Sequence, residues 1–252
     1  MNAAAKLLTL IGRSLKIAAN NPRRLSHVLG TALSASEEVC ERDLDLLRFP
    51  QLAVQDLLPP PGSEFRTRHC FFPKTNASIS PLECVALALL LRRAKASKAF
   101  EFGTYKGVST AQLALNLEEG GQVFTLDLPE DPIETAYEIS IEKDYVIAAE
   151  RGKGALLPPD LRHRVTFLRQ DSARFDPAAY AGQMDFVFVD GAHNAEYVRN
   201  DSEKGWQMLR SGGIMAWHDC VVWDADVVRY LLACPYRPAR VVGTSLAFAT
   251  KP

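Results

Sequence analysis

Apolar and polar positions follow two different spacings along most of this chain. From about residue 98, short apolar runs of strand length alternate with longer stretches in which apolar residues recur at helical spacing. The longer stretches predict helices over 107–118, 132–150, 194–210 and 224–233. Runs that are apolar throughout and separated by helices indicate a parallel sheet covered on both faces, so we predict a doubly wound α/β fold. The predicted strands are KAFEF, GQVFTLDL, RVTFLRQD, MDFVFVD, GIMAWHD and a closing hairpin of ARVVG with LAFAT.

The first 58 residues have a helical pattern only. Residues 1–36 carry basic side chains and no acid. This pattern favours a helix that packs on its own domain or across a dimer. A basic amphipathic helix that contacts a membrane surface or an acidic partner is the alternative. The apolar stripe consists of Leu7, Ile11, Leu15 and Ala18.

A boundary is predicted near residue 80. The sequence PPPG at 59–62 ends the helical pattern. Ser80, Pro81 and Glu83 then have the residue types of a capping box with proline at the first helical position. We therefore expect a helical N-terminal extension over 1–79, acting as a lid or oligomer contact, and one α/β domain over 80–252.

Composition excludes several classes of protein. The formal net charge of −1 gives no nucleic-acid signature. Five cysteines without a Cys-x-x-Cys pair predict neither a disulfide framework nor a zinc knuckle, and they suit the cytoplasm. No apolar run reaches the roughly 18 residues of a membrane span, and Arg13 and Lys16 interrupt the only stretch that resembles a secretory signal.

Acidic residues stand at or just after the ends of five consecutive predicted strands. Because the carboxyl ends of parallel strands meet at one edge of a sheet, where ligands bind, these carboxylates predict a ligand-lined rim. The acids are Glu101, Asp127, Asp171, Asp190 and Asp219, the last directly after His218.

The first of these strand ends leads into a glycine-containing loop. A dinucleotide fingerprint needs a glycine where this chain has Tyr105, so the loop between Gly103 and Gly107 suits a ligand without a pyrophosphate. Asp127 is placed to accept hydrogen bonds from ribose hydroxyls, and Asp171 from an adenine amino group. A ribose and an adenine without phosphates indicate S-adenosylmethionine.

Five segments in this order resemble class I S-adenosylmethionine-dependent methyltransferases. More narrowly, they resemble the branch with the Asp-Gly-x-His signature, which includes macrocin-type sugar O-methyltransferases. The resemblance covers about residues 80–250. It implies a Rossmann-like methyltransferase sheet of seven strands, mostly parallel, with the last strand antiparallel. The segments are FEFGTYKGVS, FTLDL, RQDSARFD, MDFVFVDGAHNAEYVRND and SGGIMAWHD.

The resemblance also implies roles for matching positions. Asp190 and Asp219 match carboxylates that hold a divalent cation, Mg²⁺ or a similar ion, and His193 matches the histidine base. His218 is a second catalytic candidate, with ligand and packing roles as alternatives. Asp201 is expected to be solvated or structural. The implied cofactor-binding residues are Glu101, Gly103, Tyr105, Gly107, Ser109, Asp127, Asp171, Ser172 and Asp190.

We therefore predict a cytoplasmic enzyme that catalyses metal-assisted O-methylation of a small-molecule acceptor. A sugar or natural-product hydroxyl is the first expectation. An alcohol must lose its proton during attack, and imidazole is suited to accept it. The alternatives are a cofactor-binding scaffold without chemistry, a nicotinamide-dependent oxidoreductase, and a membrane-surface adaptor that acts through the N-terminal helix. A homo-oligomer is also compatible with the N-terminal stripe.

Overall fold

The computed structural model describes residues 45–60, 66–69, 78–139, 141–221 and 224–252. The chain divides into two units, Met1–Asp45 and Leu46–Pro252, and all described residues except Asp45 belong to the second. The predicted apolar stripe of the N-terminal helix lies outside the described residues.

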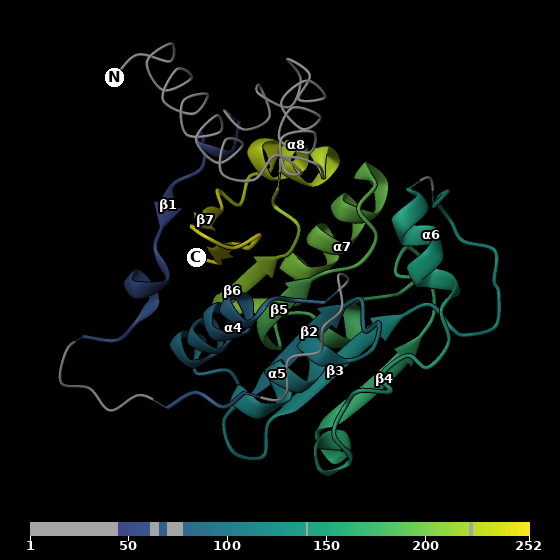
Figure 1. The fold of residues 1–252 in the computed structure, drawn as a ribbon, viewed down its shortest axis with the longest axis horizontal. Coiled ribbons are helices and arrows are strands. Elements are labelled where there is room, and N and C mark those ends of the chain that lie inside the picture. The colour runs from purple at the N-terminus through teal and green to yellow at the C-terminus, as the bar shows by residue number, and fades with distance from the viewer. Residues whose placement is uncertain (1–44, 61–65, 70–77, 140, 222–223) are drawn as a thin grey trace, which may run out of the picture. The chain divides into compact units, whose positions relative to one another are not determined.

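In the described part of the chain, eight strands form one sheet in the order β1-β7-β8-β6-β5-β2-β3-β4 (Figure 1). Neighbouring strands are parallel except that β8 runs antiparallel to β6 and β7. The predicted doubly wound, Rossmann-like sheet with an antiparallel last strand is therefore confirmed. The strands are β1 (Gln51–Leu52), β2 (Lys98–Phe102), β3 (Gln122–Asp127), β4 (Val165–Arg169), β5 (Met184–Val189), β6 (Leu209–Trp217), β7 (Ala239–Val241) and β8 (Ala247–Thr250).

The eighth strand, β1, corrects the prediction of seven strands and of helix throughout residues 1–58. Gln51 and Leu52 pair in parallel with Arg240 and Val241 of β7. The N–H of Arg240 donates to the carbonyl of Pro50 at 2.8 Å. This pairing satisfies backbone groups along β7 that would otherwise form an open sheet edge. Because the two strands are far apart in the sequence, local periodicity does not predict their pairing.

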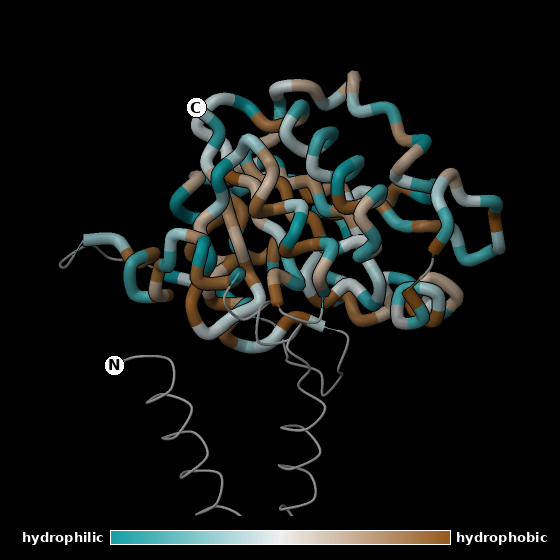
Figure 2. The backbone as a smooth tube through the Cα atoms, turned by 90° about the horizontal axis from the view of Figure 1, so that it is seen from above, coloured by the Kyte–Doolittle hydropathy of each residue, from teal (hydrophilic) through white to brown (hydrophobic). Residues whose placement is uncertain are grey.

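Helices cover both faces of the sheet. Alternate side chains of β5 point to opposite faces: Phe186 and Phe188 pack in the cluster that contains α4 and α5, whereas Val187 and Val189 pack with α7 and α8. Helices α4 and α5 lie side by side (Figure 1), and many of the apolar, brown segments of the backbone lie in the interior of this unit (Figure 2). The helices are α4 (Pro81–Ala94), α5 (Val108–Asn116), α6 (Glu142–Ala149), α7 (Ala195–Met208) and α8 (Ala225–Ala233), with 3₁₀ turns η1 (Val54–Leu57), η2 (Pro159–Arg164) and η3 (Ala178–Tyr180).

Two helix starts show what the sequence did and did not reveal. The capping box of α4 is present, because Ser80 Oγ accepts from the N–H of Glu83 and the carboxylate of Glu83 accepts from the N–H of Ser80. The helix predicted over 132–150 instead begins at Glu142. The N–H of Ala136 donates to Asp171 at 2.7 Å, and this tertiary contact holds the preceding segment out of a helix.

Within the described residues, every helix falls short of the length and apolarity that crossing a bilayer requires.

Candidate active site

The loop between β2 and α5 is shaped by two glycines in the left-handed region. Gly103 has a φ of 93°, and a Cβ there would lie 1.9 Å from the carbonyl oxygen of Asp190. Gly107 has a φ of 87° and caps α5, close to Gly154. Tyr105, between them, has a φ of 43°, which is uncommon for a residue with a side chain. The loop is therefore a tight turn that brings backbone N–H groups to the carboxyl edge of the sheet.

Glu101 lies beneath this loop rather than on the cavity wall. Its side chain is fully buried, and Oε2 accepts hydrogen bonds from Thr110 at 2.5 Å and Thr125 at 2.6 Å. Burial is the main cause that raises the pKa of Glu101 to about 7, with a further contribution from the charge of Asp190. The structure thus places Glu101 as a support of the loop, whereas the sequence implied a cofactor contact.

Asp127, at the end of β3, connects the glycine loop to a distant segment. Its Oδ2 accepts from the backbone N–H groups of Thr104 at 3.1 Å and Tyr105 at 2.8 Å. Its Oδ1 pairs with the ammonium of Lys153, whose side chain is almost fully buried. The carboxylate predicted to bind ribose is therefore held in one orientation from two sides.

Lys153 is a site-associated residue that sequence reasoning missed. Glu130 Oε1 accepts from the N–H groups of Gly152 and Lys153, and the N–H of Gly154 donates to the carbonyl of Tyr105 at 2.7 Å. These contacts fix the segment that follows α6 against the glycine loop. The Gly-Lys-Gly sequence at 152–154 is its only local signal.

Asp171 follows β4 and organises the far end of the site. Its Oδ1 accepts from the N–H of Ala173 at 2.9 Å and from the hydroxyl of Tyr197 at 3.1 Å, while its Oδ2 accepts from the N–H of Ala136. The side chain is buried. The carboxylate predicted to lie near adenine therefore also anchors the segment between β3 and α6.

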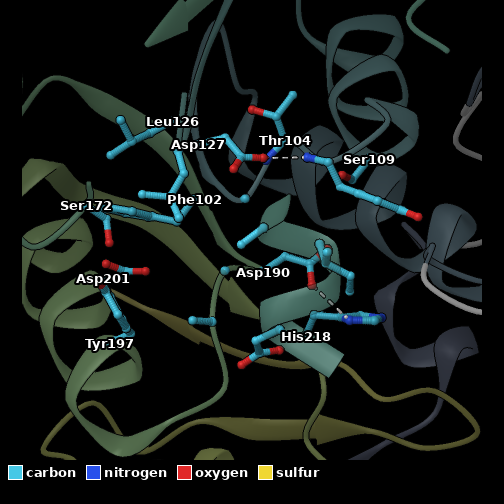
Figure 3. A pocket seen from close by; sticks show the side chains of 18 of the residues that line it. Phe102, Thr104, Ser109, Leu126, Asp127, Ser172, Asp190, Tyr197, Asp201 and His218 are labelled. Carbon is cyan, nitrogen blue, oxygen red and sulfur yellow. Dashed lines mark hydrogen bonds and ion pairs between the residues drawn. The ribbon is translucent and has the colours of Figure 1, made fainter. Parts of the chain in front are cut away.

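Asp201 of α7 was expected to be solvated or structural, and its burial excludes the first of these. Its side chain is only 2% exposed, and it lies beside Ser172 and Tyr197 on the cavity wall (Figure 3). Oδ1 accepts from Asn200 at 2.8 Å, and a Cβ at residue 191 would lie 3.0 Å from Oδ2, so a larger residue at Gly191 would crowd this carboxylate. Burial raises the pKa of Asp201 to about 7.

Asp190, His218 and Asp219 form a compact group at the ends of β5 and β6. One ligand atom from each lies within 4.8 Å of the other two, an arrangement suited to a metal ion. His218 Nδ1 is 3.1 Å from both Asp190 Oδ1 and Asp219 Oδ2, and Figure 3 shows the contact between Asp190 and His218. Asp219 has a φ of 54°, and such strain in a residue with a side chain is common at functional sites.

His193 stands between two carboxylates. Its Nδ1 is 2.5 Å from Asp144 Oδ1, its backbone N–H donates to Asp144 Oδ2 at 2.7 Å, and its Nε2 contacts Asp219. Burial opposes protonation of the ring, but hydrogen bonds and charge from these two acids outweigh it and raise the pKa of His193 to about 10. Asp144 is on α6, and nothing in the sequence pattern singled it out.

One cavity contains most of the predicted site. Glu101 is absent from its lining, and Asp144, Tyr197 and Asp201 are added to it. The predicted residues that line it are Gly103, Tyr105, Gly107, Ser109, Asp127, Asp171, Ser172, Asp190, His193, His218 and Asp219.

Comparison with known proteins gives the class of this chain. Residues 100–220 match a family model described as a methyltransferase domain. The chain is 25% identical over 207 residues to caffeoyl-CoA O-methyltransferase from Stellaria longipes, covering 80% of this chain and 76% of that enzyme. It is 25% identical over 170 residues to caffeoyl-CoA O-methyltransferase 3 from Nicotiana tabacum, covering 68% of this chain and 64% of that enzyme.

A solved structure shows the same fold. Cofactor-bound Rv0187 from MTB matches with a TM-score of 0.51 and 17% identity, over 91% of this chain and 97% of that one. That structure shows the Rossmann-like fold alone, while the match to the methyltransferase domain and the curated relatives give the activity: the chain is an S-adenosylmethionine-dependent methyltransferase. Within that class it is similar to the O-methyltransferases of small molecules typified by caffeoyl-CoA O-methyltransferase. The sugar-specific branch predicted from the Asp-Gly-x-His signature is not shown by these matches and stays a prediction.

Proposed function

We propose that this chain transfers a methyl group from S-adenosylmethionine to a small-molecule hydroxyl with the help of a divalent cation. One observation carries the proposal: the glycine loop, the cation group of Asp190, His218 and Asp219, and the imidazole of His193 line the same cavity. A cofactor loop, a place for a hydroxyl and a base are the components that O-methylation requires.

The cofactor end of the cavity extends from the glycine loop to Asp171. S-adenosylmethionine brings its own reactive methyl group, so the protein contributes position and electrostatics. Asp127 lines this end of the cavity, and Lys153 and the loop N–H groups hold its carboxylate in one orientation, so Asp127 is the proposed ribose-binding residue. Ser172 and Tyr197 line the wall assigned to adenine.

The residues present fit a cation. His218 Nδ1 lies between two carboxylates, and among the described residues neither of its ring nitrogens makes a hydrogen bond of good geometry. Buried polar atoms without partners are rare, so these nitrogens indicate a ligand. A bound divalent cation supplies Lewis acidity, which lowers the pKa of a coordinated hydroxyl.

His193 is the proposed general base. Asp144 holds the ring through both the backbone N–H and Nδ1. Nε2 consequently faces Asp219 and the cation group. The two carboxylates raise the pKa of His193, and a cation held by Asp219 would lower it again by offsetting part of their charge. With Nδ1 protonated and donating to Asp144, Nε2 would then take the acceptor proton, an arrangement typical of oriented histidine bases.

The acceptor surface favours a substrate with an apolar face. Ile79, Ile139 and Ile147 line the cavity together with the polar site residues. The similar enzymes are named for caffeoyl-CoA, and another is named for flavonoids. We therefore place a phenolic hydroxyl first, with the predicted sugar hydroxyl as the second acceptor class to test.

The test is a pair of measurements on the metal-stripped full-length protein. Calorimetric titration with S-adenosylhomocysteine is expected to show micromolar binding that Asp127→Asn weakens. Turnover with labelled S-adenosylmethionine on vicinal phenols and sugars is expected only after a divalent cation is restored. Absence of cofactor binding would refute the methyltransferase proposal. Binding without turnover on any acceptor, with or without cations, would instead favour the scaffold alternative.

A further inference from the structure

We propose that His218 is a nitrogen ligand of the cation site, and that the site therefore prefers a transition-metal ion such as Fe²⁺, Co²⁺ or Zn²⁺ over Mg²⁺. The inference rests on the proposed function, because it specifies the cation of the same site. It revises the sequence-based expectations of a catalytic role for His218 and of Mg²⁺ as the first choice of ion.

The position of Nδ1 is the first support. It is 3.1 Å from an oxygen of Asp190 and 3.1 Å from an oxygen of Asp219. Both ring nitrogens are buried, and among the described residues neither makes a hydrogen bond of good geometry, although carboxylate oxygens lie close to each. A buried imidazole nitrogen that lies close to two carboxylates without a well-directed hydrogen bond to either is suited to share a cation with them.

Glu83 provides the second support, because it faces the other ring nitrogen. Its Oε2 lies 3.4 Å from His218 Nε2. Metal-bound histidines commonly direct the second ring N–H to a carboxylate, which fixes the tautomer and the ring orientation. A proton on Nε2, facing Glu83, leaves the lone pair on Nδ1, the nitrogen that faces Asp190 and Asp219.

Glu83 is itself held rigidly. Its Oε2 accepts from the N–H of Ser80 at 2.7 Å, within the capping box of α4. Its Oε1 accepts from the N–H of Ser245 at 2.8 Å and from the hydroxyl of Ser245 at 2.6 Å. Three hydrogen bonds thus hold the carboxylate of Glu83 in the orientation that faces His218.

The backbone of His218 is also fixed relative to β5. The N–H of His218 donates to the carbonyl of Val189 at 3.0 Å, one residue before Asp190. The ligands at the ends of β5 and β6 are therefore tied together by the sheet, so the donor set is assembled before any ion binds.

The donor set decides which ion is preferred. Mg²⁺ selects oxygen ligands and binds through carboxylates and water. Imidazole favours iron, nickel, copper and zinc, while affinity for nitrogen-containing sites rises toward the end of the first transition row. Two carboxylates with one imidazole therefore favour the later ions over Mg²⁺.

Calorimetry on the metal-stripped full-length protein tests the preference. Zn²⁺ or Co²⁺ is expected to bind at least about tenfold more tightly than Mg²⁺. His218→Asn, which replaces nitrogen with an amide oxygen, is expected to weaken Co²⁺ binding about 100-fold while changing Mg²⁺ affinity by no more than about threefold. An equal loss for both ions, or no loss for either, would overturn the inference.

Glu83→Gln separates ring orientation from folding. Glutamine suits the same capping-box position, so the melting temperature should remain close to that of the unaltered protein. Co²⁺ affinity is expected to fall about tenfold, as for other outer-shell changes. Unchanged Co²⁺ affinity in this variant would contradict the orienting role of Glu83.

A spectroscopic readout identifies the nitrogen directly. Electron paramagnetic resonance of the Cu²⁺-loaded protein should show nitrogen coupling that disappears in His218→Asn and persists in His193→Asn. Persistence in His218→Asn would overturn the assignment. Titration with S-adenosylhomocysteine distinguishes this failure from that of the proposed function, because cofactor binding does not depend on which atom of His218 holds an ion.

Discussion

Asp127, Asp171 and Asp201 are buried or half-buried carboxylates on one cavity, and their neighbours distinguish them. Asp127 pairs with a buried ammonium, and Asp171 accepts two backbone N–H groups and a tyrosine hydroxyl. Asp201 accepts from Asn200, and its burial raises its pKa to about 7. The same residue type is thus an orienting group, a loop anchor and a proton-binding group within one site.

The raised pKa of Asp201 predicts a pH-dependent stability. A carboxyl whose pKa is higher in the folded state than in the unfolded state binds more protons when folded, so its contribution is complete below about pH 4 and is lost as the pH rises through about 7. Between pH 4 and pH 8, Asp201→Asn should lose less unfolding free energy than the unaltered protein, by on the order of 2 kcal/mol. Urea denaturation between pH 4 and pH 8 measures it, with exposed Asp176→Asn as the control. If unfolding free energy depended on pH equally in the unaltered protein, Asp201→Asn and Asp176→Asn, the prediction would be contradicted.

Asp144 is expected to act through His193. Asp144→Ala removes the acceptor that holds Nδ1, so kcat should fall by about 100-fold, in the range typical of lost general-base catalysis. S-adenosylhomocysteine affinity should change little. Glu142→Ala, on the exposed side of the same helix, is the matched control. A loss of cofactor affinity as large as the loss of kcat would show that Asp144 supports the cavity rather than the base.

At the scale of elements, the loop between β2 and α5 depends on the absence of a side chain at Gly103. Gly103→Ala places a methyl group against the carbonyl of Asp190, so it should abolish cofactor binding and lower the melting temperature. Gly120→Ala is the matched control, since Gly120 also has a positive φ but no atom within 4 Å of the added Cβ. That control should cost only about 1–2 kcal/mol, the cost of left-handed backbone. Similar effects of the two changes would contradict the steric argument.

The elements that could be predicted are those with a local signal. Apolar runs located β2 to β6, and Ser80 with Glu83 located the start of α4. The start of α6 could not be predicted, because a carboxylate 35 residues away binds the N–H of Ala136.

The candidate site divides in the same way. Acids at strand ends were accessible from the sequence because parallel strands bring their carboxyl ends together. Glu83, Asp144 and Lys153 were not, because each reaches the site from a helix or loop through a contact that no spacing rule encodes.

At the scale of the whole molecule, one compact unit begins at Leu46, so we expect truncation up to residue 45 to be tolerated. Removal of residues 1–45 should leave the sheet folded and able to bind S-adenosylhomocysteine. Removal of residues 1–58 also removes β1 and the buried Phe49 and Leu57. This second truncation should lower stability by several kcal/mol, about 2–5 for each large apolar side chain lost, and should expose β7 to aggregation.

Thermal unfolding and light scattering of the two truncated proteins check this prediction. A chain beginning at residue 46 that aggregates as readily as one beginning at 59 would show that the N-terminal segment is required for the sheet domain. A chain beginning at 59 that remains monomeric and stable would show that β1 contributes little.

The left-handed backbone of Asp219 limits which residues evolution or an experimenter can place there. Asparagine and aspartate adopt this conformation readily and also offer an oxygen, whereas glycine adopts it and offers nothing. Glutamate, the usual conservative replacement, keeps the charge but carries a backbone penalty. Alanine combines that penalty with loss of the ligand, so its phenotype mixes two causes. Glycine is consequently the informative deletion at this position, and a saturation library should retain function only with asparagine or aspartate.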